Sequence, residues 1–305
     1  MLVSTKGMLE KARNRRYAVG AFNISNLEFL QAVIEAAAAQ KSPVIVQTSE
    51  SGIAYGGIKS LAAMVRTAAE DAKIPVALHL DHGQSIESVR AAIRNGYTSV
   101  MIDASHLSLD KNIAATRKAV SIAAAKGVAV EAELGTIGGR EDYVRGRIEY
   151  TDPQLAQRFV EATGVDVLAV AVGTSHGAYK FSTHARHKLD LRRLAQIAKL
   201  VKIPLALHGA SGVYRDVVRK ASRYGAQLGA TTGNSDAEIR ASIRLGVSKI
   251  NTDTDLRLAF TAELRKFIAT KPKAIDPREM LGAGRSAVKA MVMKRIQLFG
   301  SKGKA

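Results

Sequence analysis

The stretch PVALHLDHG (residues 75–83) combines a short apolar run with histidine and aspartate side chains near its end. Side chains alternate between the two faces of a β-strand, so Leu78 and Leu80 should face surrounding helices while His79 and Asp81 face inward. Near-continuous apolar runs of this length are typical of parallel strands that are buried on both faces. Seven other apolar, β-branched runs lie outward along the chain, at residues 19–24, 43–49, 99–105, 127–135, 166–173, 204–209 and 248–254.

Longer amphipathic stretches separate these runs, for example at residues 27–40, 86–96 and 215–225. Strand–helix alternation repeated eight times predicts an α/β fold, a closed (β/α)8 TIM barrel. An open doubly wound sheet is the alternative, but no G-x-G-x-x-G follows the first run. We expect one domain over residues 1–305, with an extra C-terminal helical segment, a closing helix and tail from about 277 to 305. The interval 210–247 is long enough for an additional helix or an inserted loop.

The composition excludes several classes of protein. The chain has 305 residues, 45 Lys+Arg against 27 Asp+Glu, a formal net charge of +18, and no cysteine or tryptophan. Thiolate nucleophiles, disulfide scaffolds and cysteine-ligated metals are therefore excluded. No apolar run approaches the roughly 18 residues that span a bilayer, and the basic N-terminus lacks the apolar core of a secretory signal, so we expect a cytoplasmic protein. Nucleic-acid binding is a minor alternative, since aromatic residues make up only 5%.

Polar residues gather at the C-terminal ends of the predicted strands, which is where the active site of a barrel lies. Burying so many ionisable groups is unfavourable unless a metal ion or a charged substrate compensates them. The residues are Asn23, Ser49, Asp81, His82, Asp103, Ser105, Glu133, His176, His208, Asn251, Asp253 and Thr254.

Three histidines, His82, His176 and His208, lie at strand ends or just beyond them. Three neutral imidazoles with one open position are a typical catalytic zinc site. For a single histidine, a hydrogen-bonded core residue is the more common outcome, and only the barrel geometry brings these three together. For His79 we expect that core role, because it lies one layer deeper, from where it could also orient a neighbouring ligand.

Two glycine-rich turns, HGASG (208–212) and SHGAYK (175–180), would let backbone N–H groups approach an anion closely. Together with NTDT (251–254), the first turn forms the loops after strands seven and eight, where barrels commonly hold phosphate. The stretch ELGTIGGRED (133–142) places Glu141 on what should be a mobile loop, where it is either a base delivered to the substrate or a solvated surface acid.

PVALHLDHG (75–83) and VEAELGTIGGRE (130–141) closely resemble the two signature stretches of the class II, zinc-dependent fructose-bisphosphate aldolases. Four further blocks resemble that family in the same order, from about Phe22 to the C-terminus. They are VGTSHGAYK (172–180), LHGASGV (207–213), KINTDTDLR (249–257) and DPR (276–278).

The resemblance implies a lyase that reversibly cleaves fructose 1,6-bisphosphate to dihydroxyacetone phosphate and glyceraldehyde 3-phosphate through a zinc-stabilised ene-diolate. His82, His176 and His208 match the zinc ligands, Asp81 the acid/base at the C4 hydroxyl, and Glu141 the carboxylate that moves the C1 proton. Co²⁺ or another divalent ion in place of Zn²⁺, a monovalent cation and a homo-oligomer, a dimer or larger, are further implications. The positions that match contacts to the ketone's phosphate and hydroxyls are Gly177, Gly209, Ala210, Ser211, Asn251, Asp253 and Thr254, and those at the far end of the sugar are Asn23, Ser49 and Arg278.

The chain departs from the family pattern at two places. Many relatives carry an acid immediately before the loop glutamate, where this chain has Arg140, so a second metal position would depend on Asp103 and Glu133. The stretch YGAQLGATTGNSD (224–236) is longer than in compact relatives and has no assigned role.

Three alternatives to this reaction stay open at the level of sequence. A class I, lysine-based mechanism is disfavoured because Lys249 alone approaches a strand interior, at the edge of strand eight, while Lys180 is expected to meet phosphate. A tagatose 1,6-bisphosphate or other ketose-phosphate aldolase is the nearest alternative. A zinc hydrolase would need neither a loop glutamate nor clamps for two phosphates.

Overall fold

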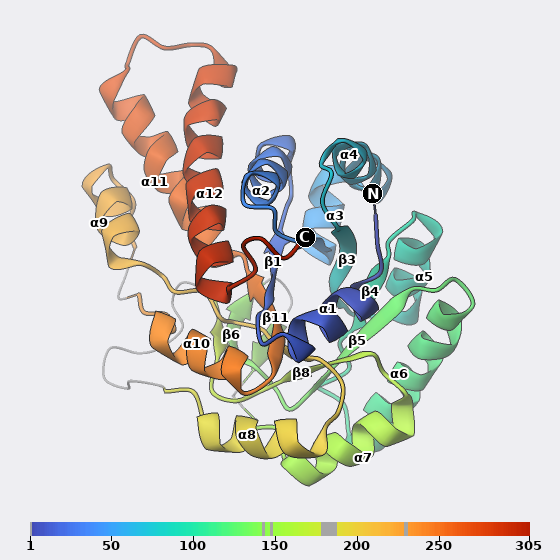
Figure 1. Cartoon of the computed structure of the whole chain (residues 1–305). Coiled ribbons are helices and arrows are strands. Elements are labelled where there is room, and N and C mark those ends of the chain that lie inside the picture. Colours follow the sequence, from blue (N-terminus) through green and yellow to red (C-terminus); the bar gives the residue numbers. More distant parts are fainter. Residues whose placement is uncertain (1, 142–143, 147–148, 178–187, 229–230) are drawn as a thin grey trace.

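A closed barrel of eight parallel strands forms the centre of the protein. The computed structural model describes residues 2–141, 144–146, 149–177, 188–228 and 231–305 (Figure 1). Around the barrel the strands follow the order β1-β11-β10-β8-β5-β4-β3-β2. Every one of the eight predicted runs contains a strand, which confirms the TIM barrel. The bounds are β1 Val19–Asn23, β2 Val44–Ser49, β3 Val76–Gly83, β4 Ser99–Ile102, β5 Ala129–Leu134, β8 Val167–Val170, β10 Leu205–Leu207 and β11 Val247–Thr252.

Helices surround the barrel, and several of them begin at polar caps. Asn26, Ser85 and Ser235 each accept a hydrogen bond from a backbone N–H of the first turn, which satisfies one of the donors left unpaired there. The helices are α1 Thr5–Asn14, α2 Leu27–Ala39, α3 Glu50–Gly56, α4 Ile58–Asp71, α5 Ile86–Arg94, α6 Leu109–Ala124, α7 Pro153–Thr163, α8 Leu191–Leu200, α9 Arg215–Arg223, α10 Asp236–Arg244, α11 Thr254–Thr270 and α12 Pro277–Phe299.

Strand alternation places the apolar side chains of the barrel strands in two clusters. Leu78 and Leu80 belong to the cluster between the strands and the helices, as predicted, whereas Ala77 lies in the cluster inside the barrel. Met8 and Leu9 of α1 join this inner cluster, so α1 closes one end of the barrel (Figure 1). The apolar filling of that end leaves the opposite end, where the strands finish, for polar side chains.

Two connections bear on the sequence-based expectations. The interval 210–247 holds two helices, α9 and α10, in keeping with the additional helix expected there. The backbone around Glu141 is not a simple loop: Gly138–Glu141 forms a short strand, β6, which pairs with β7 (Val144–Gly146) and β9 (Ser175–His176). Pairing with β9 brings this segment beside one of the predicted metal ligands.

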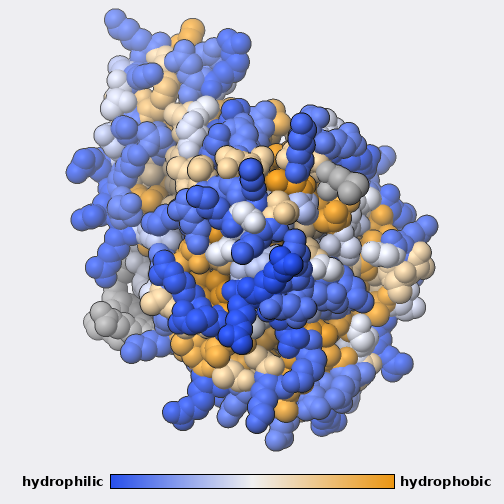
Figure 2. All heavy atoms as spheres, viewed as in Figure 1, coloured by the Kyte–Doolittle hydropathy of each residue, from blue (hydrophilic) through white to orange (hydrophobic). Residues whose placement is uncertain are grey.

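Helices α11 and α12 form an antiparallel hairpin that projects away from the barrel (Figure 1). Hydrophilic side chains cover most of the face seen in Figure 2, in keeping with a chain of 24% charged residues. Within the described residues, none of the helices combines the length and the apolarity needed to cross a bilayer.

Candidate active site

Six of the twelve polar residues predicted at the strand ends line one cavity, at the end of the barrel opposite α1. Strand register helps to place them: Gln47 of β2 is level with His79 of β3, and Ser49 is level with Asp81. All ten lining residues are among those predicted from the sequence: Asn23, Asp81, His176, Gly177, Gly209, Ala210, Ser211, Asn251, Asp253 and Thr254.

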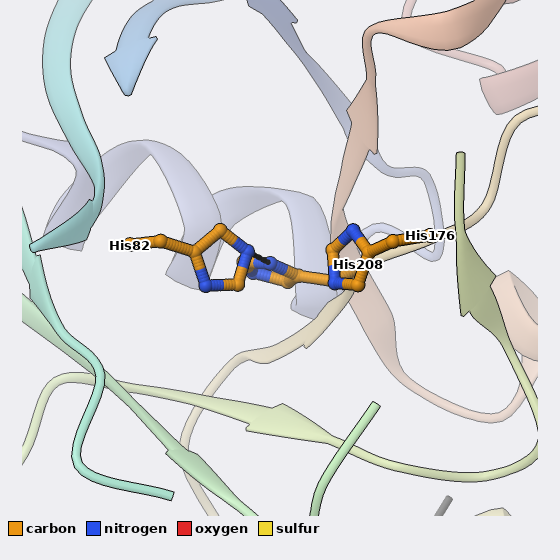
Figure 3. Close-up of side chains that lie close together, drawn as sticks. All are labelled: His82, His176 and His208. Carbon is orange, nitrogen blue, oxygen red and sulfur yellow. Dashed lines mark hydrogen bonds between the residues drawn. The ribbon is translucent and has the colours of Figure 1, made fainter. Parts of the chain in front are cut away.

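The side chains of His82, His176 and His208 converge from three different parts of the chain (Figure 3). One nitrogen from each ring lies within 4.8 Å of the others. The ring centroids of His82 and His208 are 4.7 Å apart, and those of His82 and His176 are 5.1 Å apart. Nε2 of His82 and Nδ1 of His208 lie 2.9 Å apart. This spacing allows all three imidazoles to share one ion.

Carboxylates behind two of the rings fix their orientation. Nδ1 of His82 is 2.7 Å from Oδ2 of Asp103, and Nε2 of His208 is 2.6 Å from Oε1 of Glu131. With those ring nitrogens donating to carboxylates, the other nitrogens direct lone pairs at each other. Two facing lone pairs repel unless a proton or a metal ion lies between them. Carboxylate–histidine pairs of this kind typically support bound metal ions.

The electrostatics of the cluster also favour a cation. Burial alone would lower the pKa of His82, but the charges of Asp81 and Asp103, and the hydrogen bond to Asp103, raise it to about 10. Burial, followed by the positive charges of Lys249 and His82, holds the pKa of His208 well below its ordinary value. The donor set and its acidic surroundings therefore fit a divalent ion bound by neutral imidazoles.

Asp103 and Glu133 lie on the far side of His82 and form with it a second group that could hold a metal ion. Burial opposes ionisation of Asp103, but its hydrogen bonds to His82 and Ser105 hold its pKa well below the ordinary range. Burial and the nearby Asp103 raise the pKa of Glu133 well above its usual value. Among the described residues, Oε2 of Glu133 has no hydrogen-bond partner. The ligand atoms of His82, Asp103 and Glu133 lie within 4.8 Å of one another, and the alternative metal position there stays a prediction.

Below the histidines lies a charged layer, of which the sequence analysis predicted His79 but not Lys249. Lys249 was expected at a strand edge, but the structure places it in the middle of β11, fully buried inside the barrel. Its Nζ is 3.0 Å from Oε2 of Glu131 and donates to Oδ1 of Asn251 at 2.7 Å. His79 contacts the same carboxylate at 3.8 Å, and burial and Lys249 lower its pKa well below normal. Alternation along KINTD, which puts Lys249 and Asn251 on one face, was the signal available.

Three amide groups hold the carboxylate of Asp81. Nδ2 of Asn23 and Nε2 of Gln47 donate to its Oδ2 at 2.8 and 3.1 Å, and Nδ2 of Asn251 donates to its Oδ1 at 2.9 Å. Gln47 also donates to Oδ1 of Asn23 at 2.7 Å, which fixes the amide of that asparagine. Gln47, another residue missed in the sequence, therefore orients Asp81 beside the metal-ligand cluster.

Backbone groups form the other side of the cavity. Gly209 has φ 59°, and a Cβ there would meet the backbone of Ser175 at 2.7 Å, so only glycine fits at this approach. Thr254, in the first turn of α11, also lines the cavity. Glycine-rich backbone beside a helix N-terminus suits an anionic group.

A second cavity of about 220 Å³ shares Asn23 and Asp253 with the first. Ser49 lines it, as does Arg257, which the sequence analysis did not single out. Arg257 pairs with Asp253 at 2.7 Å and is 57% exposed. The two cavities together provide space for a ligand that is longer than one three-carbon unit.

The structure does not bring every predicted residue to this site. Lys180 lies outside the described residues, as does the side chain of Glu141, whose backbone ends β6. Arg278 is 89% exposed, pairs with Asp276, and stands at the end of the α11–α12 hairpin farthest from the barrel (Figure 1). The roles assigned to these three residues stay predictions.

Comparisons with known proteins place the chain in one family of aldolases. Residues 3–304 match the family described as fructose-bisphosphate aldolase class-II. The chain is 50% identical over 308 residues to a fructose-bisphosphate aldolase of Thermus caldophilus, covering 100% of both chains. It is 45% identical to one from Giardia intestinalis, over 100% of this chain and 94% of the other. The crystal structure of the YdjI aldolase from Escherichia coli K12 superposes with a TM-score of 0.81 at 34% identity, over 100% of each chain.

Proposed function

The chain belongs to the class-II fructose-bisphosphate aldolase family and is a carbon–carbon lyase, and we propose that it uses Zn²⁺ to cleave and re-form fructose 1,6-bisphosphate. The observation that carries the metal assignment is the convergence of His82, His176 and His208 within 4.8 Å. These three imidazoles would hold the ion, with Asp103 and Glu131 orienting two of them. When bound, the ion supplies a Lewis acid that stabilises negative charge developing on the substrate's ketone oxygen.

Asp81 is positioned to move the proton of the C4 hydroxyl. In cleavage, its carboxylate accepts that proton while the C3–C4 bond breaks, the C4 hydroxyl becomes the aldehyde, and the electron pair passes to the ketone half. Its three amide donors hold it in place for this transfer, since a general base acts from within hydrogen-bond reach of the proton. Glu141 is assigned the second proton transfer, returning a proton to C1 of the dihydroxyacetone phosphate half.

The two cavities match the two ends of a sugar bisphosphate. Gly209, Ser211 and Thr254 would meet the phosphate of the ketone half through backbone and hydroxyl groups. Ser49 and Arg257 would meet the far phosphate in the second cavity. Asp81 lies at the first cavity beside Asn23, which is common to both, and this is where the bond between the two halves would be broken.

The proposal is tested by cleavage assays on the zinc-loaded protein with the two C4 epimers, fructose and tagatose 1,6-bisphosphate. We expect faster cleavage of the fructose compound, with equal amounts of the two triose phosphates. Preference for the tagatose compound would reassign the substrate. Release of inorganic phosphate without carbon–carbon cleavage would instead indicate a hydrolase.

The second cavity gives a separate prediction for Arg257. Arg257→Met should raise KM for fructose 1,6-bisphosphate by about 10-fold, since a charged hydrogen bond contributes roughly 1.5–3 kcal/mol. KM for fructose 1-phosphate, which lacks the far phosphate, should stay unchanged. Both KM values are measured in a coupled assay, with the exposed Arg219→Met as a matched control. An equal rise for both substrates would show that Arg257 does not contact the far phosphate.

A further inference from the structure

Val213 has an unusual backbone conformation beside the active site. Its φ is 46°, in the left-handed region that β-branched residues strongly disfavour. Five described residues other than glycine have positive φ, and Val213 is the single β-branched residue among them. It follows Ala210 and Ser211, which line the cavity, within the loop of residues 208–214. Strain of this kind persists only where the surroundings enforce it.

A buried ion pair enforces this conformation. The backbone N–H of Gly212 donates to Oδ2 of Asp255 at 2.9 Å, and that of Val213 donates to Oδ1 at 2.8 Å. Asp255 is 1% exposed, and Nε of the fully buried Arg295 lies 3.7 Å from its Oδ2. Arg295 also donates to the carbonyl of Ala210 at 2.9 Å. The pair therefore contacts backbone groups on either side of Ser211.

A third contact comes from the stretch 224–236, which the aldolase assignment leaves without a role. Nδ2 of Asn234 donates to the carbonyl of Gly209 at 2.9 Å, and the backbone N–H of Asn234 donates to the carbonyl of Ser211 at 3.2 Å. A Cβ on Gly233 would meet the carbonyl carbon of Gly212 at 2.3 Å. The end of this stretch is thus packed directly against the 208–214 loop.

A purely stabilising role does not account for the arrangement. A buried ion pair is generally no more stabilising than apolar side chains of the same size. Here the hydrogen bonds described between the loop and Asp255 or Asn234 all involve the loop's backbone, and Arg295 donates to one of the loop's carbonyls. Asp255, Arg295 and Asn234 do not line the substrate cavity themselves.

We propose that Asp255, Arg295 and Asn234 are positioning residues that clamp the 208–214 loop in its strained conformation, so that its backbone is ready for the phosphate of the substrate. The identity of this ligand rests on the proposed function. A loop that is already ordered loses less entropy on binding and binds more tightly. Without the clamp, Val213 would relax to negative φ and the backbone groups would turn away from the phosphate.

Asp255→Asn tests the clamp, because an amide cannot accept both N–H groups and no longer neutralises Arg295. We expect KM for fructose 1,6-bisphosphate and the inhibition constant of inorganic phosphate to rise by about 10-fold. The kcat should change by less than about twofold, since phosphate binding contributes equally to the ground and transition states. Bound metal should be unchanged. Asp216→Asn, at an exposed aspartate of α9, is the matched control.

Val213→Gly separates positioning from general stability, because glycine adopts positive φ without strain. In the Asp255→Asn background, Val213→Gly should lower the raised KM part of the way back to the parent value, since the productive loop conformation is no longer disfavoured. Val213→Gly should change Tm differently in the two backgrounds. The resulting Tm shift should be more positive in the parent, by roughly a few degrees, than in Asp255→Asn, where the strain at residue 213 has already relaxed.

The Tm comparison needs no turnover, so it tests the clamp even if fructose 1,6-bisphosphate is not the substrate. Equal Tm changes in both backgrounds, or unchanged phosphate inhibition in Asp255→Asn, would overturn the proposal. If Asp255→Asn does not fold, Arg295→Lys replaces it in both comparisons, because lysine lacks the planar fork that reaches Asp255 and Ala210 together.

Discussion

His208→Ala is expected to abolish metal binding and aldol cleavage together. The substitution removes one of three converging imidazoles and leaves Glu131 without the ring it orients. Two histidines seldom hold a catalytic zinc ion, since such sites in proteins have three protein ligands. Loss of several kcal/mol of Lewis-acid stabilisation lowers kcat/KM by at least about 10³-fold.

Metal content of the purified variant and its rate of fructose 1,6-bisphosphate cleavage measure the effect. His106→Ala, at an exposed histidine, should match the parent in both. Glu131→Gln is a graded comparison: the three rings remain but one loses its carboxylate, so metal affinity should fall by about 10–100-fold while excess metal restores the rate. If His208→Ala holds zinc as tightly as the parent, the ligand set is wrong.

Chelation of the parent enzyme should have the same consequence as His208→Ala and should be reversed by Zn²⁺ or Co²⁺. Activity that survives chelation would point to Lys249, because class I aldolases form a Schiff base on a lysine inside the barrel. In this structure, however, the ammonium of Lys249 is held by Glu131 and Asn251. Full activity after chelation, with a borohydride-trapped adduct on Lys249, would refute the metal mechanism.

The barrel and the polar residues at the C-terminal ends of its strands could be predicted because both depend on local patterns. A buried parallel strand needs a continuous apolar run, and alternation fixes which side chains face the axis, as the clusters containing Leu78 and Ala77 confirm. Once eight strands close into a barrel, their C-terminal ends must meet. The convergence of His82 and His208, which are 126 residues apart, follows from that closure.

Interactions across the barrel interior could not be predicted in the same way. Lys249 and Glu131 are 118 residues apart on strands that are not neighbours, so no local pattern pairs them. Arg295 on α12 and Asp255 in the first turn of α11 lie on neighbouring helices, but a pair so far apart along the chain is likewise not fixed by a local pattern. The left-handed backbone of Val213 had no sequence signal, since valine is among the residues least suited to it.

Asp81→Asn is expected to lower kcat for fructose 1,6-bisphosphate cleavage by about 10²–10⁴-fold, the usual contribution of general acid–base catalysis, while metal binding is retained. Asparagine keeps the size of the side chain but cannot accept the C4 hydroxyl proton. Asp81 is not among the three converging ligands, so zinc content should match the parent. Gln47→Leu, which removes one donor to Asp81 but keeps its carboxylate, should lose no more than about 10-fold.

Exchange of the C1 proton of dihydroxyacetone phosphate with deuterated solvent distinguishes this role from general damage to the site. The exchange requires the metal and the base assigned to Glu141 but not the C4 hydroxyl, which the triose lacks. It should therefore persist in Asp81→Asn at close to the parent rate while cleavage is lost. Because His208→Ala should lose both reactions, the two variants together separate stabilisation of charge from transfer of the C4 proton. A parallel loss of exchange and cleavage in Asp81→Asn would show that Asp81 supports the metal rather than the proton transfer.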